Sequence, residues 1–468
     1  MEFVSHHKIT IGKEVLDYSA VAGEIFLKDQ EGTPQASIFS ISYLKEGVDR
    51  PESRPVTFLF NGGPGSSAVW LHLGAFGPKH LAFSNETVIP GAPPYQLTDN
   101  PDTLLRFSDL VFVDPVGTGY SRALGKKKDL DYWGVDEDSA SIAQFIRSYL
   151  TKNKRWNSPK FLCGESYGTI RASVLIRDLE LKLLDSVAFD GVILLSTALD
   201  VRTFMTAGPG NELPYVTNLP TFAATAYYHN ALPEKPTDLE TFLREARAFA
   251  SGEYLAALFQ GDSLPADRAK QIAAKLRRFT GLSEEYLLRT HLRIDSNRFL
   301  KELLRALGQT IAIHDTRFLG KDPDDVGEAV QFDPFLFGIA GPFVATINSY
   351  LSSDLKVKME LPYQVFSLEA SQSWKRAGHN TSAFDGFLYT AQYLGQAAAT
   401  NKDFRIFVAS GLHDLATAFY ATEYIFDHSG IPKDRVTLKN YYGGHMMYLY
   451  APSSKQMSED LRVFIQGK

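Results

Sequence analysis

Residues 161–168 read FLCGESYG, a short apolar run that ends at a serine between two glycines. A periodic stretch follows over residues 169–184, in which Val174, Leu175, Leu179 and Leu183 are spaced to share one helical face. A strand, a G-x-S-x-G turn and a helix in this order form a nucleophile elbow, which lifts a serine hydroxyl clear of a sheet. Taken alone, the pentapeptide also fits a glycine-rich turn that carries a surface serine.

Other apolar runs mark further strands of the same sheet. The runs at 56–60 and 110–113 end at segments rich in glycine and proline, and a third run covers 192–195. A helical pattern over about 137–150 separates the second of these runs from residues 161–163. Continuous apolar strands that alternate with helices are typical of a parallel sheet covered on both faces. We therefore predict an α/β fold with a mainly parallel central sheet.

The alternation is interrupted in the middle of the chain. Residues 206–344 are mostly helical in pattern, including a long stretch at 283–307. Three strands and a helix are then expected at 363–366, 404–409, 436–438 and about 386–399. The length of 468 residues alone suggests about three domains. The pattern instead predicts one catalytic core of residues 1–205 and 345–468, interrupted by a helical cap of residues 206–344.

Composition narrows the classes of function. The chain has 54 acidic and 48 basic residues, a net charge of −6, which argues against a protein built to bind nucleic acid or anionic lipid. The single cysteine, Cys163, excludes an internal disulfide. No apolar run reaches about 18 residues, so we expect no transmembrane helix. Residues 1–13 contain no signal peptide, so the expected location is cytoplasmic, or exported with the signal removed.

A serine nucleophile needs a histidine as base and usually a carboxylate that orients it. After such an elbow the acid precedes the histidine in the chain. Asp414 follows the expected strand at 404–409, and His445 lies in a loop after the strand at 436–438. Each has an ordinary alternative, a helix N-cap for Asp414 and a surface or core histidine for His445. His413 competes with His445, but a carboxylate rarely orients its own chain neighbour toward a third group.

Acyl transfer also needs backbone donors for a developing oxyanion. One is expected from Tyr167, the residue after the serine, and the other from the loop after an earlier strand. Residues 61–65 (NGGPG) fill that place, and Gly63 is the predicted donor. The alternatives are a simple turn or a phosphate loop, but the Lys-Ser/Thr pair of a phosphate loop is missing.

We predict no cofactor and no metal ion. The sequence Gly117-Thr118-Gly119 resembles the start of a dinucleotide fingerprint, yet Arg122 stands at the third glycine position. The eleven histidines form no H-E-x-x-H motif, and no paired cysteine ligands exist.

Four segments together resemble the serine carboxypeptidase family: residues 61–67 (NGGPGSS), 114–121 (DPVGTGYS), 164–168 (GESYG) and 444–446 (GHM). The resemblance implies an α/β-hydrolase fold with a largely helical cap, and a peptide substrate with a free C-terminus. It implies roles for seven residues: a nucleophile, base and orienter, two oxyanion donors, and two groups that bind the substrate carboxylate, namely Ser166, His445, Asp414, Gly63, Tyr167, Asn61 and Glu165.

The sequence departs from the eukaryotic members at one of these sites. There a second glutamate, in a Glu-Leu-Gly-Pro segment, shares a proton with the glutamate before the nucleophile. Here residues 75–78 read AFGP, so Ala75 stands in that place. Glu165 must be protonated to donate a hydrogen bond to a carboxylate. Ser66 replaces a cysteine that often forms a disulfide in those enzymes, which is similar to a bacterial-type branch.

The predicted function is a serine-type carboxypeptidase that releases C-terminal amino acids through an acyl-enzyme. An esterase or acyltransferase on the same scaffold is the first alternative, because the three catalytic residues do not fix the acyl acceptor. A binding protein that kept the fold without activity is the second. The sequence does not indicate an oligomeric state.

Overall fold

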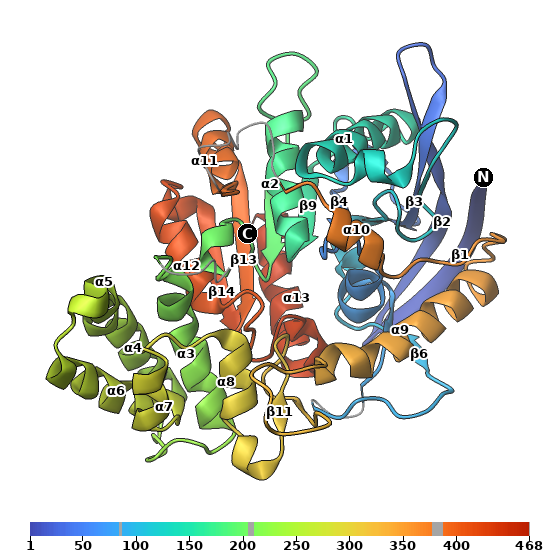
Figure 1. The fold of residues 1–468 in the computed structure, drawn as a ribbon. Coiled ribbons are helices and arrows are strands. Elements are labelled where there is room, and N and C mark those ends of the chain that lie inside the picture. The colour runs from blue at the N-terminus through green and yellow to red at the C-terminus, as the bar shows by residue number, and fades with distance from the viewer. Residues whose placement is uncertain (84–86, 205–209, 377–386, 468) are drawn as a thin grey trace.

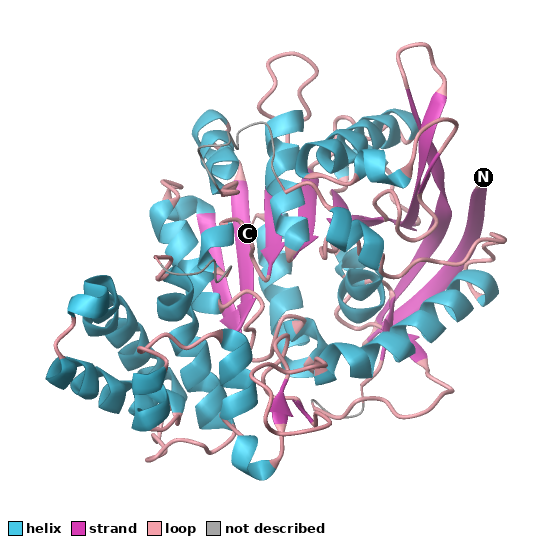
Figure 2. Cartoon of the chain, in the orientation of Figure 1, coloured by secondary structure: helices cyan, strands magenta, loops and turns pink. Residues whose placement is uncertain are grey.

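The structure is a computed structural model, and it describes residues 1–83, 87–204, 210–376 and 387–467 (Figure 1). Within these residues a ten-stranded sheet runs through the molecule, as Figure 2 shows in magenta. Its strand order is β1-β2-β3-β7-β4-β9-β10-β13-β14, and β8 pairs with β3. The bounds in this order are Glu2–Ile11, Glu14–Lys28, Pro34–Lys45, Asp109–Val113, Val56–Phe60, Lys160–Glu165, Gly191–Leu195, Arg405–Gly411 and Val436–Tyr441, with β8 at Arg122–Ala123.

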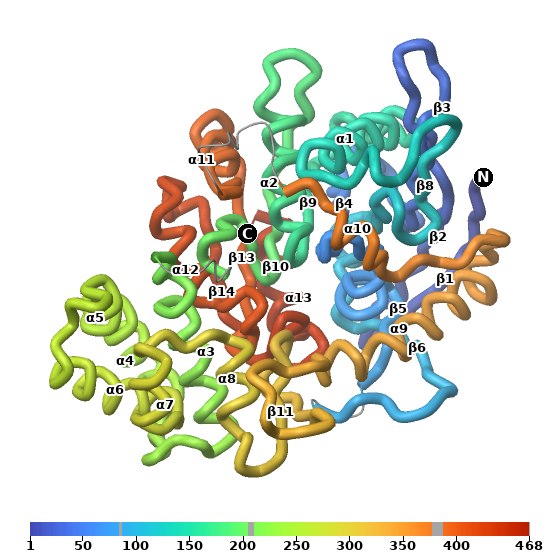
Figure 3. The backbone as a smooth tube through the Cα atoms, in the orientation of Figure 1, coloured from blue at the N-terminus to red at the C-terminus, as the bar shows by residue number. Residues whose placement is uncertain are grey.

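The six strands from β7 to β14 in this order all run parallel to one another. Strands β1, β2 and β3 add an antiparallel extension at one edge. The mainly parallel sheet is therefore confirmed. The prediction of a strand at 363–366 is wrong, because Gln364 and Phe366 form only single bridges, with Gly119 and Ser66 in the loops after β7 and β4. The backbone of this segment leads into the short helix at Leu368–Ser373, labelled α10 in Figure 3.

Alternate residues of the parallel strands face two hydrophobic layers. In β10, Val192 and Leu194 belong to one buried cluster, and Ile193 and Leu195 belong to the other. Helices on one face are α1 (Val135–Lys152), α2 (Tyr167–Leu179), α11 (Ala391–Thr400) and α12 (Phe419–His428). On the other face lie the π-helical turn η2 (Leu71–Phe76), α9 (Pro334–Ser353) and α13 (Ala451–Gln466). This two-sided burial explains why the strands read as continuous apolar runs.

Six helices form a unit of their own between β10 and β13, to one side of the sheet in Figure 1. They share a hydrophobic cluster that also takes in Leu415 and Phe419 near the start of α12. The long helix expected at 283–307 is two short helices, because His291 and Leu292 adopt positive φ between them. The six helices are α3 (Leu213–Tyr228), α4 (Leu239–Phe249), α5 (Leu255–Gln260), α6 (Ala266–Thr280), α7 (Glu284–Arg289) and α8 (Ser296–Glu302).

The boundary predicted at residues 344 and 345 falls inside α9. Buried side chains of α9, among them Phe335, Phe343 and Tyr350, belong to the cluster on the sheet and not to the cluster of the helical unit. We propose that the core resumes with α9, and the division into core and cap otherwise stays a prediction. By length and composition α9 could cross a membrane, although core helices pass the same test and this helix packs on the sheet.

The remaining short elements lie in loops around these layers. Two pairs of short strands lie outside the main sheet, β5 (Lys79–Leu81) with β6 (Leu97–Asp99), and β11 (Thr310–Ile311) with β12 (Leu319–Gly320). The helix α10 (Leu368–Ser373) follows the segment that bridges to Ser66.

Candidate active site

Ser166 lies at the sharp turn between β9 and α2. Its φ of 57° and ψ of −124° are unusual for a residue with a side chain, and its N–H donates to the carbonyl of Leu195 at 2.9 Å. A Cβ on Gly164 would lie 2.0 Å from the Gly168 oxygen, and one on Gly168 would lie 2.6 Å from the Phe60 oxygen. Both flanking glycines are therefore required by close backbone approach, and strained backbone of this kind clusters at functional sites.

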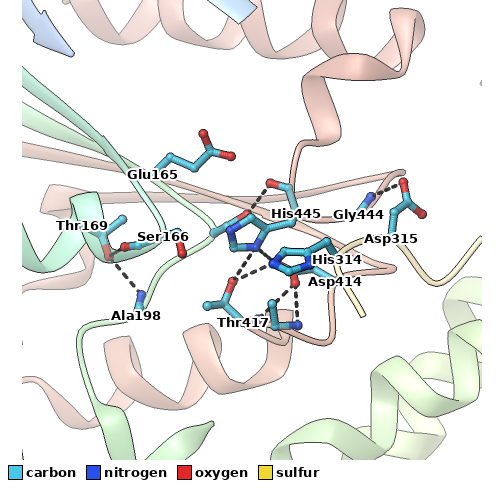
Figure 4. Close-up of polar contacts among 12 residues, drawn as sticks. Glu165, Ser166, Thr169, Ala198, His314, Asp315, Asp414, Thr417, Gly444 and His445 are labelled. Carbon is cyan, nitrogen blue, oxygen red and sulfur yellow. Dashed lines mark hydrogen bonds and ion pairs between the residues drawn. The ribbon is translucent and has the colours of Figure 1, made fainter. Parts of the chain in front are cut away.

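Asp414 and His445 form a buried pair at the carboxyl ends of β13 and β14. The Nδ1 of His445 lies 2.8 Å from Oδ2 of Asp414 (Figure 4). Burial alone would lower the pKa of His445, but the carboxylates of Asp414, Glu165 and Asp333 together outweigh it and raise the pKa above its ordinary value, with Asp414 the largest of the three. The hydrogen bond fixes Nδ1 as the protonated nitrogen when the ring is neutral, so Nε2 is left to act as a base.

The surroundings of Asp414 and His413 differ in the structure. Asp414 does accept backbone hydrogen bonds, from Ala416 at 2.8 Å and Thr417 at 3.0 Å, but α12 begins only at Phe419. Its other oxygen also accepts the Thr417 hydroxyl at 2.7 Å. The ring of His413 instead lies 3.3 Å from the Thr316 hydroxyl. Asp414 is thus oriented by a turn so that it faces His445.

The loop that carries His445 is held from two further sides. The Ser196 hydroxyl, after β10, donates to the His445 carbonyl at 2.7 Å. The His445 N–H donates to the His314 carbonyl at 2.5 Å, and the Gly444 N–H donates to Asp315 at 3.1 Å. His314 and Asp315 come from the segment after the six-helix unit. The histidine is therefore fixed by chain segments far apart in sequence.

Ser166 and His445 line one cavity of about 420 Å³. Figure 4 places their side chains next to each other, above Thr417. No hydrogen bond joins these two described residues, and catalytic hydrogen bonds often tighten only in the substrate complex. Asn61, Glu165 and His314 line the same cavity.

The loop after β4 lies against the start of α2. A Cβ on Gly62 would lie 2.5 Å from the Tyr167 nitrogen, so the loop backbone passes directly beside that amide. Tyr167 is the first residue of α2, and the first N–H groups of a helix have no partner within it. The amides of Tyr167 and of the loop can therefore point at one oxyanion. Gly63 lines the cavity, and its role as the second donor stays a prediction.

Arg171 holds the backbone of the loop after β4. It is fully buried in α2, and its Nη1 donates to the Asn61 carbonyl at 2.6 Å. Its Nε donates to Asp138 of α1, also at 2.6 Å. A buried arginine held by a carboxylate is a rigid donor, so it fixes where the loop backbone runs. Sequence reasoning missed Arg171, because nothing in its neighbourhood marks a long-range contact.

Glu165 is a buried carboxyl in the wall of the cavity. It accepts hydrogen bonds from the Asn61 amide nitrogen and from the Tyr448 hydroxyl, the latter at 3.0 and 2.9 Å. Burial raises the pKa of Glu165 to about 7, whereas His445 and the two donors act in the opposite direction. A proton is thus available on Glu165 near neutral pH. Tyr448 was also missed from the sequence, although it lies only three residues after His445.

A second histidine and aspartate meet at the rim of the cavity. The Nδ1 of His314 lies 2.6 Å from Asp333, and the ring of His314 meets the ring of His445 edge to face at 5.2 Å. Asp333 also caps α9 by accepting from Phe335 and Leu336. Among the residues that the structure describes, no three histidine, cysteine or acidic side chains form a group that could hold a metal ion.

Comparisons with known proteins find similarity in sequence over part of the chain. Residues 33–188 match the family model of the serine carboxypeptidases. Two relatives from Arabidopsis thaliana are similar over shorter stretches: serine carboxypeptidase-like 44 is 33% identical over 132 residues, and serine carboxypeptidase-like 19 is 30% identical over 127. Each alignment covers 27% of this chain and 24% or 26% of the relative, so the chain spans about a quarter of the length of the curated relatives that it matches.

A solved structure extends the similarity in fold to nearly the whole chain. Kex1 of Saccharomyces cerevisiae, described as a prohormone-processing carboxypeptidase, aligns with a TM-score of 0.59 at 14% identity, over 96% of this chain and 91% of that one. The matched residues 33–188 include Asn61, Ser166 and Tyr167, whereas Asp414 and His445 lie outside them. The bacterial-type branch stays a prediction. The chain is thus similar in sequence to the serine carboxypeptidases over residues 33–188, and it has the α/β-hydrolase fold.

Proposed function

We propose that this protein is a serine-type carboxypeptidase that acts on peptides with a free C-terminus. The observation that carries the proposal is a single cavity lined by Ser166 at a strained elbow, His445 paired with Asp414, and the buried carboxyl Glu165. The first three supply acyl-transfer chemistry. The fourth, when protonated, supplies a donor for a terminal carboxylate.

The reaction follows from these positions. Nε2 of His445 takes the proton of Ser166 as its Oγ attacks the last peptide carbonyl, and the amides of Gly63 and Tyr167 donate to the oxyanion. His445 then gives that proton to the leaving amine, which departs as a free amino acid. Water, activated by His445 in the same way, hydrolyses the acyl-enzyme and restores Ser166.

The cavity walls favour apolar side chains in the substrate. Six apolar residues line it beside the polar groups: Trp70, Leu336, Phe337, Ala340, Phe366 and Met446. Burial of an apolar side chain against such a wall contributes about 25 cal/mol per Å². We propose that peptides with apolar residues at the cleaved bond are better substrates than charged ones.

The direct test compares a blocked dipeptide, such as an N-acylated Phe-Leu, with its C-terminal amide. Release of leucine from the free acid only, and its loss in Ser166→Ala, are the expected results. Equal cleavage of the acid and the amide would overturn the exopeptidase assignment. Rapid turnover of esters with no peptide hydrolysis would favour an esterase instead. Replacing leucine with lysine or aspartate then tests the apolar preference, which predicts a lower kcat/KM for both.

A further inference from the structure

The hydroxyl of Tyr448 donates a hydrogen bond to the carboxyl group of Glu165, in the wall of the candidate active site. It lies in the short turn Met447–Leu449, and its side chain is buried. The hydroxyl lies 3.0 Å from Oε1 and 2.9 Å from Oε2 of Glu165. The Asn61 amide nitrogen donates to Oε2 of the same group. Glu165 is therefore held by two donors from different chain segments, one after β4 and one after His445.

The ring of Tyr448 fills the space beside the turn η2. A Cβ on Gly74 would lie 3.0 Å from Cε2 of Tyr448, and the ring of Phe76 lies 6.5 Å from that of Tyr448. The intervening residue, Ala75, is buried and has a methyl side chain that cannot hydrogen-bond to Glu165. The ring of Tyr448 thus packs against η2, while its hydroxyl reaches Glu165.

Asn61 is fixed in the same network. Its Oδ1 accepts the N–H of Leu71, the first residue of η2, at 3.1 Å. This contact assigns the oxygen and leaves the Nδ2 group to donate. Nδ2 has two hydrogens, and only one is needed for Glu165. The second can donate to a substrate oxygen in the cavity that Asn61 lines.

We infer that Tyr448 is a positioning residue for substrate recognition, whose hydroxyl fixes the Glu165 carboxyl so that Glu165 and Asn61 together bind the C-terminal carboxylate of the peptide. This inference rests on the proposed function. It assigns to Tyr448 a role that a purely packing side chain would not have, because phenylalanine would fill the same space without the hydroxyl.

The ionisable groups around Glu165 determine how the effect of Tyr448 should depend on pH. Glu165 is faced by Tyr448 and His445 from the loop after β14, by Asp414 after β13, by Asn61 after β4 and by Cys163 on its own strand. Burial holds the pKa of the Tyr448 phenol well above its ordinary value, so the phenol keeps its proton at neutral pH. The Glu165 carboxyl is then the member of this pair that titrates, and its ionised form is the one that Tyr448 stabilises.

The test is Tyr448→Phe, assayed on the blocked dipeptide and on its C-terminal amide from pH 5.5 to 8.5. At low pH we expect KM for the dipeptide to rise about tenfold with kcat nearly unchanged, as for one lost hydrogen bond, and kinetics on the amide to stay as they were. In the wild type we expect KM for the dipeptide to rise with pH as Glu165 ionises. In Tyr448→Phe the midpoint of this rise should move upward by roughly one pH unit, because the ionised form of Glu165 loses a hydrogen-bond donor. Equal changes on both substrates, or an unmoved midpoint, would overturn the inference.

Two further variants keep the result interpretable. Tyr254→Phe is the matched control, because this buried hydroxyl donates to the Leu292 carbonyl at 2.6 Å in the six-helix unit; it should leave both KM values unchanged. In Glu165→Gln the side chain at this position cannot ionise, so KM for the dipeptide should not change with pH. If KM still rises with pH, another group causes the rise, and the inference is refuted. Failure of the proposed function is separate, since the wild-type protein would then show no preference for the free acid.

Discussion

Arg171 joins helices α1 and α2 to the loop after β4, and Arg171→Met tests how that loop is held. The arginine donates to Asp138 and to the Asn61 carbonyl, each at 2.6 Å. The side chains of Arg171 and Asp138 are 0% and 3% exposed, so solvent screens neither charge. Methionine keeps much of the side-chain volume and removes every donor.

The single and the double variant should differ in unfolding free energy but not in kcat/KM. Arg171→Met leaves the Asp138 carboxylate buried without its cation, which costs about 3–5 kcal/mol of unfolding free energy. The double variant R171M/D138L removes that stranded charge as well, so most of the lost stability should return. The Asn61 carbonyl lacks its charged donor in both variants. Such a hydrogen bond contributes about 1.5–3 kcal/mol, so kcat/KM should fall roughly 10- to 100-fold in both.

Urea unfolding gives the stability, and hydrolysis of a blocked dipeptide gives kcat/KM. Lys301→Met is the control, because it breaks a buried ion pair with Asp322, at 2.8 Å, in a different part of the chain; it should lower stability but leave the kcat/KM of the folded protein unchanged. The reasoning is refuted if Arg171→Met unfolds within about 1 kcal/mol of the wild type. It is also refuted if the double variant regains activity together with stability.

Three other outcomes follow from the site. Asp414→Asn should lower kcat about 10⁴-fold, because an amide favours the wrong tautomer of His445; a loss below tenfold in the same assay would rule out Asp414 as the orienter. Gly62→Ala should lower kcat about 10²- to 10³-fold, since its Cβ would lie 2.5 Å from the Tyr167 nitrogen and displace an oxyanion donor; unchanged kcat would place the oxyanion elsewhere. A pH profile of kcat/KM on the dipeptide should be bell-shaped. It should rise as His445, whose pKa is raised by Asp414 despite burial, loses its proton, and it should fall as Glu165 ionises with a pKa of about 7. With the C-terminal amide the alkaline fall should disappear, and a bell that persists there would contradict the role of Glu165.

Five of the six parallel strands could be predicted because they are buried on both faces, whereas exposed and half-buried residues alternate along β14. A continuous run such as residues 56–60 has few readings other than a buried strand, and the structure has β4 at those residues. The hairpin of β1 and β2 gave no such signal, because exposed and buried or half-buried residues alternate along β1. The helix expected at 283–307 failed for a local reason, the positive φ of His291 and Leu292, which periodicity does not report.

Some residues of the candidate site could be predicted from the sequence, and others could not. Ser166, Asp414 and His445 could be named because strand ends place them at one edge of a parallel sheet, and chain order distinguishes acid from base. Arg171 and Tyr448 could not, because their roles exist only through contacts with Asn61 and Glu165, which lie more than a hundred residues away in sequence. A buried donor has no sequence pattern of its own.

The segment after the six-helix unit holds the backbone of the loop that carries His445. The carbonyl of His314 accepts the His445 N–H, and the carboxylate of Asp315 accepts the Gly444 N–H. Asp315 is itself fixed by a buried ion pair with Arg317 at 2.7 Å. The loop that carries His445 is thus held on one side by Ser196, after β10, and on the other by the segment of His314 and Asp315. Because His445 must reach both Asp414 and Ser166, a shift of this segment would move the base relative to the nucleophile. We therefore expect the predicted insertion and core to act together in the proposed reaction, even though they pack around separate hydrophobic clusters.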